Sequence, residues 1–198
     1  MDDLARSKHT QDSKETLGKV ILSNVLSLLK IVLVCFILVY FVFNYVVHPM
    51  RVNGGSMLPT LKGGEFILSN AFSGHFGEID YGDIVSAYSA DLHQDVIKRV
   101  IALPGDTVYA KDEQVYVNGL AIEEPYLDND FAQNILYANE VFTKDFDKVT
   151  LGEDEYWLMG DNRYVSIDSV QLGPFKRSDI IGKGAVVFLP FGKMRVTE

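Results

Sequence analysis

An uncharged apolar stretch near the start of the chain constrains its fold most strongly. Val20 to Val47 is apolar apart from Lys30 and a few small polar residues, and Ile31 to Val47 carries no charge. A helix of about 20 such residues crosses a hydrocarbon core of about 30 Å. A cleaved signal peptide would have an apolar region of about 7–15 residues that ends at small residues. This stretch is longer and ends in Phe43-Asn44-Tyr45-Val46-Val47-His48, which predicts an uncleaved anchor.

The cations that flank this stretch predict its orientation. Lys14, Lys19 and Lys30 lie before it or at its start, and Arg51 is the one cation close behind it. The positive-inside rule therefore places the N-terminus in the cytoplasm and the bulk of the chain on the outer face of the cell membrane. The expected parts are a cytoplasmic tail at 1–19, a single-pass transmembrane anchor at 20–47 and an extracytoplasmic domain at 48–198.

The composition of the outer domain limits its partners and its means of stabilisation. Residues 48–198 hold 13 of the 18 Lys and Arg but 23 of the 27 Asp and Glu. Such an acidic domain repels a phosphate backbone, so no nucleic-acid partner is expected. The one cysteine, Cys35, lies in the apolar stretch, so an intramolecular disulfide is impossible. About 150 residues are enough to build a packed core instead.

Short apolar runs separated by Gly, Pro, Asn and Asp predict a mostly β domain. Asn118-Gly119 between two apolar triplets is a strong signal for a type I′ hairpin. Residues 123–149 show no clear period and are interpreted as an inserted, partly exposed subregion. The predicted strands are Glu65–Phe72, Asp83–Ala90, Asp95–Leu103, Thr107–Ala110, Gln114–Val117 and Ala185–Phe191.

Ser56 follows two glycines just beyond the apolar stretch. Glycines allow a close backbone approach that a Cβ would block. Pro59, three residues later, prevents the chain from continuing as a helix or a central strand. A hydroxyl held on such a turn can serve as a nucleophile, and an ordinary loop is the alternative interpretation.

Lys98 interrupts a run of residues, Val96–Leu103, that is otherwise apolar on both faces of a strand apart from Arg99. A strand that is apolar on both sides is usually buried. Burial disfavours the charged form of a lysine and lowers its pKa, which would leave an amine able to accept a proton. The alternative is that Lys98 extends its charged end to solvent. Arg99, on the opposite face, is expected to be a structural ion-pair partner.

Three motifs together resemble those of the type I signal peptidases. That family has Gly-x-Ser-Met-x-Pro-Thr-Leu around its serine, which Gly54–Leu61 matches. Lys98–Asp106 matches the Lys-Arg-x-x-x-x-Pro-Gly-Asp pattern, and Tyr81–Val85 resembles the strand before it. Gly160–Ser169 matches Gly-Asp-Asn-Arg-x-x-Ser-x-Asp-Ser, and Gly173 falls at the expected glycine. The short chain with one anchor is similar to the compact Gram-positive form of the family.

The resemblance implies a mostly β catalytic domain, and a serine endopeptidase that removes signal peptides from exported preproteins after small-x-small sites. Ser56 would attack the scissile carbonyl, and its backbone N–H would stabilise the oxyanion. Lys98 would remove the serine proton and later protonate the leaving amine. Ser166 would hold the lysine amine, with Asp168 and Ser169 supporting that loop. The resemblance implies no cofactor and no metal, and the expected partners are preproteins and the lipid bilayer.

Two positions depart from the family pattern. Val170 stands where an arginine usually follows Asp-Ser and pairs with the aspartate, so Asp168 is expected to find another partner, such as Arg163, or to be more exposed. Gly54 stands where some members have a serine that adds a second oxyanion donor. Met57 is a candidate for lining the substrate pocket, with core packing as the alternative.

Other readings of the chain remain open. A Ser-His-Asp hydrolase would need a catalytic histidine, but His75 and His93 lie in predicted loops, and Leu58 replaces the second glycine of a nucleophile elbow. Self-cleaving repressors share the Ser–Lys pair and a similar β-rich domain, but they carry a DNA-binding helix-turn-helix where this chain has an apolar span. A catalytically degenerate, anchored β domain that binds exported proteins is the non-enzymatic alternative.

Overall fold

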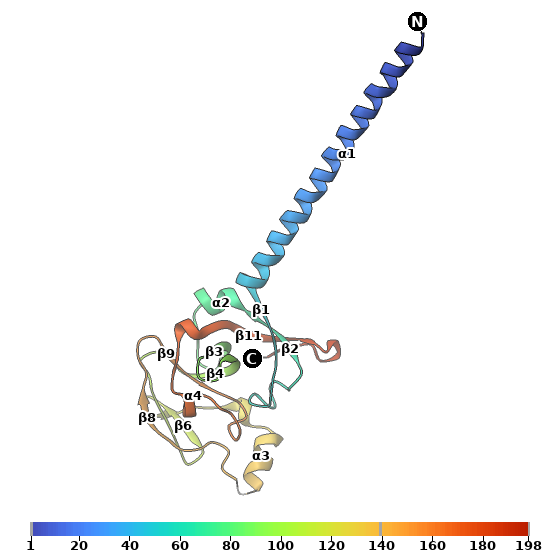
Figure 1. Cartoon of the computed structure of the whole chain (residues 1–198). Helices are drawn as coiled ribbons and strands as arrows, with labels where there is room; N and C mark the ends of the chain where they lie inside the picture. Colours follow the sequence, from blue (N-terminus) through green and yellow to red (C-terminus); the bar gives the residue numbers. More distant parts are fainter. Residues whose placement is uncertain (1, 139, 198) are drawn as a thin grey trace. The chain divides into compact units, whose positions relative to one another are not determined.

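The computed structural model describes residues 2–138 and 140–197, and the chain divides into two compact units, Met1–Phe43 and Asn44–Glu198. The first unit is the helix α1 (Asp2–Phe41), drawn in blue in Figure 1. Its segment Lys19–Phe41 has a mean hydropathy of 2.5, and by length and composition it can cross a membrane. The side chains of this segment are exposed, as expected of a helix whose solvent is lipid rather than a protein core.

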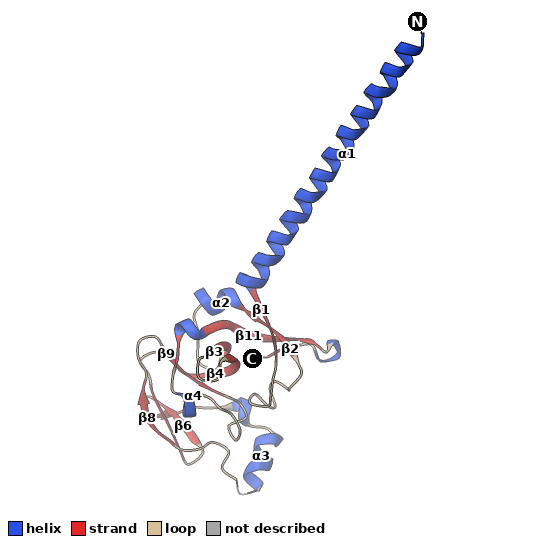
Figure 2. Ribbon diagram, in the orientation of Figure 1, coloured by secondary structure: helices blue, strands red, loops and turns tan. Residues whose placement is uncertain are grey.

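The second unit is built on a large antiparallel sheet with strand order β1-β2-β11-β3-β4-β9-β10, and with β12 paired to β11 (Figure 2). Strands far apart in sequence are neighbours here, because β11 lies between β2 and β3. The strands are β1 (Val47–Arg51), β2 (Phe66–Asn70), β3 (Ile84–Ser89), β4 (Gln94–Ala102), β9 (Glu155–Met159), β10 (Phe175–Lys176), β11 (Ile180–Leu189) and β12 (Arg195–Thr197).

A smaller sheet has the order β7-β6-β5-β8 and lies to one side of the unit, away from β1 and β2 (Figure 1). It contains β5 (Thr107–Lys111), β6 (Gln114–Val117), β7 (Leu120–Ala121) and β8 (Phe146–Thr150). Asn118 and Gly119 join β6 to β7 with φ values of 55° and 80°. Two positive φ values are what a type I′ turn requires, so the predicted hairpin is confirmed.

Short helices connect the strands. They are α2 (Ala71–Phe76), η2 (Pro125–Leu127), α3 (Asp130–Tyr137), α4 (Ser169–Leu172), η3 (Arg177–Asp179) and η4 (Phe191–Lys193). The region 123–149, interpreted from sequence as irregular, contains η2, α3 and most of β8. Because β8 pairs with β5 in the small sheet, the C-terminal end of this region is part of the core architecture rather than an appendage.

Apolar side chains form three buried clusters in the second unit. One joins the small sheet to β4 and β9 through Val108, Val115 and Trp157. A second surrounds the serine turn and includes Met57 and Leu61, neither of which is more than 1% exposed. A third lies under β3, β4 and β9. Burial of one such aliphatic side chain contributes about 1.5–3 kcal/mol, and these clusters are what hold the two sheets and the turn in register.

The mostly β fold class predicted from sequence is confirmed, and the six predicted strands correspond to β2 to β6 and β11. β1 was not predicted because it begins at Val47, where the sequence still reads as membrane anchor, whereas the α-helix ends at Phe41. β9 was not predicted either. After Glu155, its residues Tyr156–Met159 are an apolar run without alternation, because both faces of this part of the strand are buried.

Candidate active site

The turn that carries Ser56 follows β1 and is tied to the loop after β9. Asn162 donates its backbone N–H to the Ser56 carbonyl at 2.9 Å, and its side-chain amide donates to the Gly55 carbonyl at 2.9 Å. Gly54 has a φ of +83°, in the left-handed region that favours glycine. A serine at position 54 would be strained there. A second oxyanion donor from that side chain is therefore unsuited to this backbone.

Lys98 lies on β4, and its side chain is almost completely buried, with 3% of the residue exposed. The solvent-exposed alternative is thereby excluded. Its Nζ donates to Ser166 Oγ at 2.9 Å. Burial lowers the pKa of Lys98 to about 8, although the carboxylates of Asp168 and Asp161 act in the opposite direction. A substantial fraction of this amine is neutral slightly above neutral pH, as a general base requires.

Arg99, the next residue along β4, forms the ion pair expected of it. Its Nε and Nη2 donate to the two carboxylate oxygens of Asp161, each at 2.9 Å, and both side chains are buried. Thr60 Oγ1 donates to the same carboxylate at 2.5 Å. Asp161 therefore joins the serine turn to the lysine strand, and a two-point guanidinium–carboxylate contact fixes orientation as well as distance.

Asp168 does not pair with Arg163, contrary to the expectation from sequence. Its carboxylate accepts the Gly160 N–H at 2.9 Å and the Val170 N–H at 3.2 Å, and it caps α4. The arginine instead pairs with Glu124. Asp168 is only 2% exposed, so it is not more exposed in the absence of the usual arginine, since backbone donors satisfy it.

Val170 occupies the place of that arginine by packing against the apolar cluster that joins the small sheet to β4 and β9. Next to it, Ser169 is buried, and its Oγ accepts the Leu158 N–H of β9 at 2.9 Å. The hydroxyl of Ser169 thus anchors the end of the loop 160–169 to β9 of the large sheet.

Ser56 and Lys98 line one groove of about 270 Å³. One wall is Met50–Met57, from β1 into the serine turn, and the other includes Gln94–Lys98 of β4. β1 is the terminal strand of the large sheet, and among the described strands none pairs with the outer edge of Gln94–Lys98. Both walls therefore offer backbone groups to an extended ligand. Met57 is among the residues that line this groove, yet it is 1% exposed and also belongs to the core.

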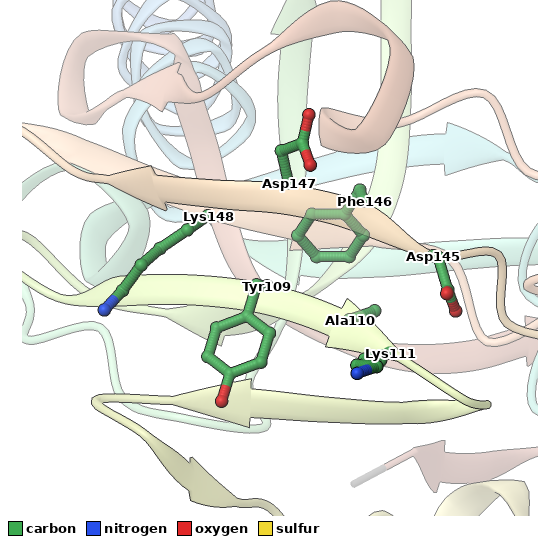
Figure 3. A pocket seen from close by; sticks show the side chains of 7 residues that line it. All are labelled: Tyr109, Ala110, Lys111, Asp145, Phe146, Asp147 and Lys148. Carbon is green, nitrogen blue, oxygen red and sulfur yellow. The ribbon is translucent and has the colours of Figure 1, made fainter.

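The two histidines weighed from sequence, His75 and His93, are not among the residues that line this groove. His75 on α2 and His93 in the β3–β4 turn are exposed, whereas His48 on β1 faces Asp95 across 3.4 Å. A separate hollow of about 490 Å³ lies over β5 and β8 (Figure 3). Exposed side chains of both charges line this hollow, including Lys111 and Asp147. Among the described residues, no group of three His, Cys, Asp or Glu could hold a metal ion.

Sequence reasoning missed several residues that build the site. Three of them, Asp161, Asn162 and Thr60, lie within the quoted motifs. Only their contacts in the structure show that they connect the serine turn with β4 and with the loop after β9. Glu124 and Tyr126 lie outside every motif, and no sequence signal marks them.

Comparison with known proteins agrees with this geometry. Residues 25–189 match the model of the family described as signal peptidase, peptidase S26. The chain belongs to this family. Signal peptidase I S of Bacillus subtilis is 38% identical over 88% of this chain and 95% of its own length. Signal peptidase I of Bacillus amyloliquefaciens is 37% identical over 89% of this chain and 94% of its own length.

A crystal structure of a signal peptidase I from Enterococcus faecalis V583 aligns with a TM-score of 0.48 at 34% identity, over 53% of this chain and 95% of that chain. Membership in the signal peptidase family gives the enzyme class: the chain is a signal peptidase I, a serine peptidase that removes signal peptides. The family is membrane-anchored, and the described residues contain an apolar N-terminal helix of sufficient length.

Proposed function

We propose that this signal peptidase is a single-pass membrane enzyme in which Ser56 is the nucleophile and Lys98 the general base, with the catalytic domain on the outer face. The observation that carries the proposal is the state of Lys98. Its amine is buried, is held by Ser166 and has a pKa of about 8, in the groove that Ser56 also lines. Burying a lysine lowers the stability of a protein, because desolvation disfavours the charged amine. Its burial here therefore supports a functional role.

The chemistry follows from these positions. Neutral Lys98 takes the Ser56 proton as Oγ attacks the scissile carbonyl carbon, and the Ser56 N–H donates to the developing oxyanion. The C–N bond then breaks, and the lysine ammonium returns the proton to the leaving amine. Water hydrolyses the ester in a second round of the same proton transfers. Ser166 supports this cycle because its Oγ accepts from Nζ and so orients the amine.

Substrate recognition is proposed to use the two open strand edges. An extended preprotein segment between β1 and Gln94–Lys98 would gain main-chain hydrogen bonds from both walls. Small residues at the −1 and −3 positions fit a groove of about 270 Å³ whose walls already hold Met57 and Ile97. A signal sequence in the same bilayer confines the substrate to the neighbourhood of the enzyme, which raises its effective concentration.

The test is cleavage of a purified preprotein by the full detergent-solubilised chain between pH 6 and 10. Ser56→Ala and Lys98→Ala should each abolish cleavage, and the exposed Lys62→Ala should serve as an unaffected control. Wild-type activity should rise with pH through about 8, where Lys98 loses its proton.

Cleavage that survives Ser56→Ala would reject the Ser–Lys mechanism. A wild-type chain that binds preprotein without cutting it would establish the degenerate binding protein. Cleavage of the chain itself, with the preprotein left intact, would establish the self-cleaving alternative. Mass spectrometry of both proteins distinguishes these outcomes.

A further inference from the structure

Glu124 is a buried carboxylate outside the catalytic motifs, in the segment after β7. Its side chain is 8% exposed, and it faces the Arg163 guanidinium, which is 1% exposed. Arg163 donates from Nη1 to Oε2 at 3.1 Å and from Nη2 to Oε1. Tyr126 donates its hydroxyl to Oε1 at 2.6 Å. Burial lowers the pKa of Arg163, but Glu124, Tyr126 and Asp161 together act in the opposite direction, so the pKa of the guanidinium is raised overall.

Arg163 connects this carboxylate to the catalytic groups through Gly160. Its Nε donates to the Gly160 carbonyl at 3.1 Å, while the Gly160 N–H donates to Asp168 at 2.9 Å. Gly160 has no room for a side chain, because a Cβ there would overlap both Ser166 Oγ and the Ser56 carbonyl. The Gly160 residue is therefore wedged between the nucleophile turn and the serine that holds Lys98. A shift of Gly160 would move both.

Tyr126 extends the same support to the lysine strand. Its ring lies 4.0 Å from the Arg99 guanidinium carbon, a cation–π contact, and Arg99 directly follows Lys98. The segment Glu124–Tyr126 therefore contacts both Arg163 and Arg99. An arginine left with no counterion in a buried place would reorient toward the carboxylates that remain, which here are Asp161 and Asp168.

We propose that Glu124 is a positioning residue for this peptidase: through Arg163 it fixes Gly160, and thereby the distance between Ser56 and the Ser166-bound amine of Lys98. This inference rests on the proposed Ser–Lys mechanism. Glu124 touches neither substrate nor the reacting atoms, so its effect should fall on the chemical step rather than on substrate binding. In kinetic terms, kcat should fall while KM stays nearly constant.

The experiment compares Glu124→Gln with Glu123→Gln in the full chain, in detergent, with one preprotein substrate. Glu123 is the adjacent, exposed residue, so both changes remove one negative charge from the same segment. Glu124→Gln should lower kcat between about 10- and 100-fold with KM within about twofold, since small misplacements of catalytic groups have effects of that size. Glu123→Gln should leave both constants unchanged. Rates are normalised to folded protein, so that lost stability alone cannot mimic the effect.

A double substitution tests the route of the effect. If Glu124 acts through Arg163, Glu124→Gln combined with Arg163→Gln should have the same kcat as Arg163→Gln alone, whereas independent effects would multiply. Where Glu124→Gln does not fold, Tyr126→Phe replaces it. That variant keeps the ring over Arg99 but removes the donor to Glu124, and it should lower kcat less while leaving KM unchanged.

Ser56→Ala in the same series separates the two ideas. The positioning role would be overturned if Glu124→Gln, or Tyr126→Phe in its place, kept the full kcat while Ser56→Ala was inactive. That result would leave the Ser–Lys mechanism intact. Equal losses for Glu124→Gln and Glu123→Gln would also overturn it, because they would show a general charge effect. Activity in Ser56→Ala would remove the mechanism on which the inference rests.

Discussion

The large and small sheets of the second unit differ in how they are assembled. The large sheet pairs segments from distant parts of the chain, as when Ile67 of β2 lies opposite Val187 of β11. The small sheet is mainly a meander of β5, β6 and β7, with β8 added at its edge. Ser56 and Lys98 belong to the large sheet and its turns. The comparison shows that long-range pairing positions the two candidate catalytic residues, while the small sheet contributes apolar packing against β4 and β9.

The first and largest predicted effect tests the contact between the two catalytic segments. Gly160→Ala should reduce activity by more than about 100-fold, because the added Cβ has to displace Ser166 or the Ser56 carbonyl. Gly192→Ala is the matched control, since Gly192 has open space around its Cβ position. Preprotein cleavage by both variants, together with their melting temperatures, checks the prediction. Full activity in Gly160→Ala would show that the loop is not held as described.

The second prediction concerns the stability cost of the lysine in the large sheet. In the unfolded chain Lys98 takes its proton at the ordinary value of 10.5, but in the folded protein only below about 8. The unfolded state therefore binds more protons between these pH values, and wild-type stability should rise with pH across that window. Lys98→Met should raise the free energy of unfolding by about 3 kcal/mol at pH 7, with a gain that shrinks toward pH 10.5.

Urea unfolding of both proteins between pH 7 and 11 measures that difference. Lys98→Met should also be inactive throughout. If the difference in unfolding free energy between the two proteins were constant across the pH range, the substitution would act through packing. Burial of the lysine charge would then not be the source of the stability cost.

The third prediction places a matched perturbation in the small sheet. Val115→Ala removes a fully buried side chain from the cluster under β5 and β6, and it should lower the free energy of unfolding by about 2 kcal/mol. The pH midpoint of activity should stay at the wild-type value, because Lys98 lies on β4 of the large sheet and its partner Ser166 lies in the loop after β9. A shifted midpoint would show that packing in the small sheet also affects the proton equilibrium at the site in the large sheet.

The smallest predicted effect concerns Val170, where the two sheets meet. Val170→Arg should lower stability by about 1 kcal/mol, because the longer side chain has to leave the apolar cluster and reach solvent. Activity should not rise, since Asp168 is already satisfied by backbone donors. A clear gain in cleavage rate would show that Asp168 lacks the partner that the family usually supplies.

Local sequence patterns predicted much of this architecture. The two apolar faces around Lys98 predicted a buried strand, although they left open whether the lysine itself reaches solvent. Asn118-Gly119 predicted a hairpin. Both signals lie within a few residues. The pairing of Arg163 with Glu124 could not be predicted, since it joins positions 39 residues apart and neither belongs to a periodic pattern. β8 was missed for a related reason. Its pattern of exposure is irregular because a bulge shifts its register against β5.

The way β9 pairs with β4 has a consequence for where a bound chain can be cut. β9 takes the outer edge of β4 from Arg99 onward, opposite Met159, and leaves that edge open only through Lys98. A polypeptide added along the open part has to turn aside at Met159, the C-terminal end of β9, which lies opposite the residue after Lys98. With the proposed Ser56–Lys98 pair, the end of this neighbouring strand, together with the side-chain pockets, would limit which peptide bond comes within reach.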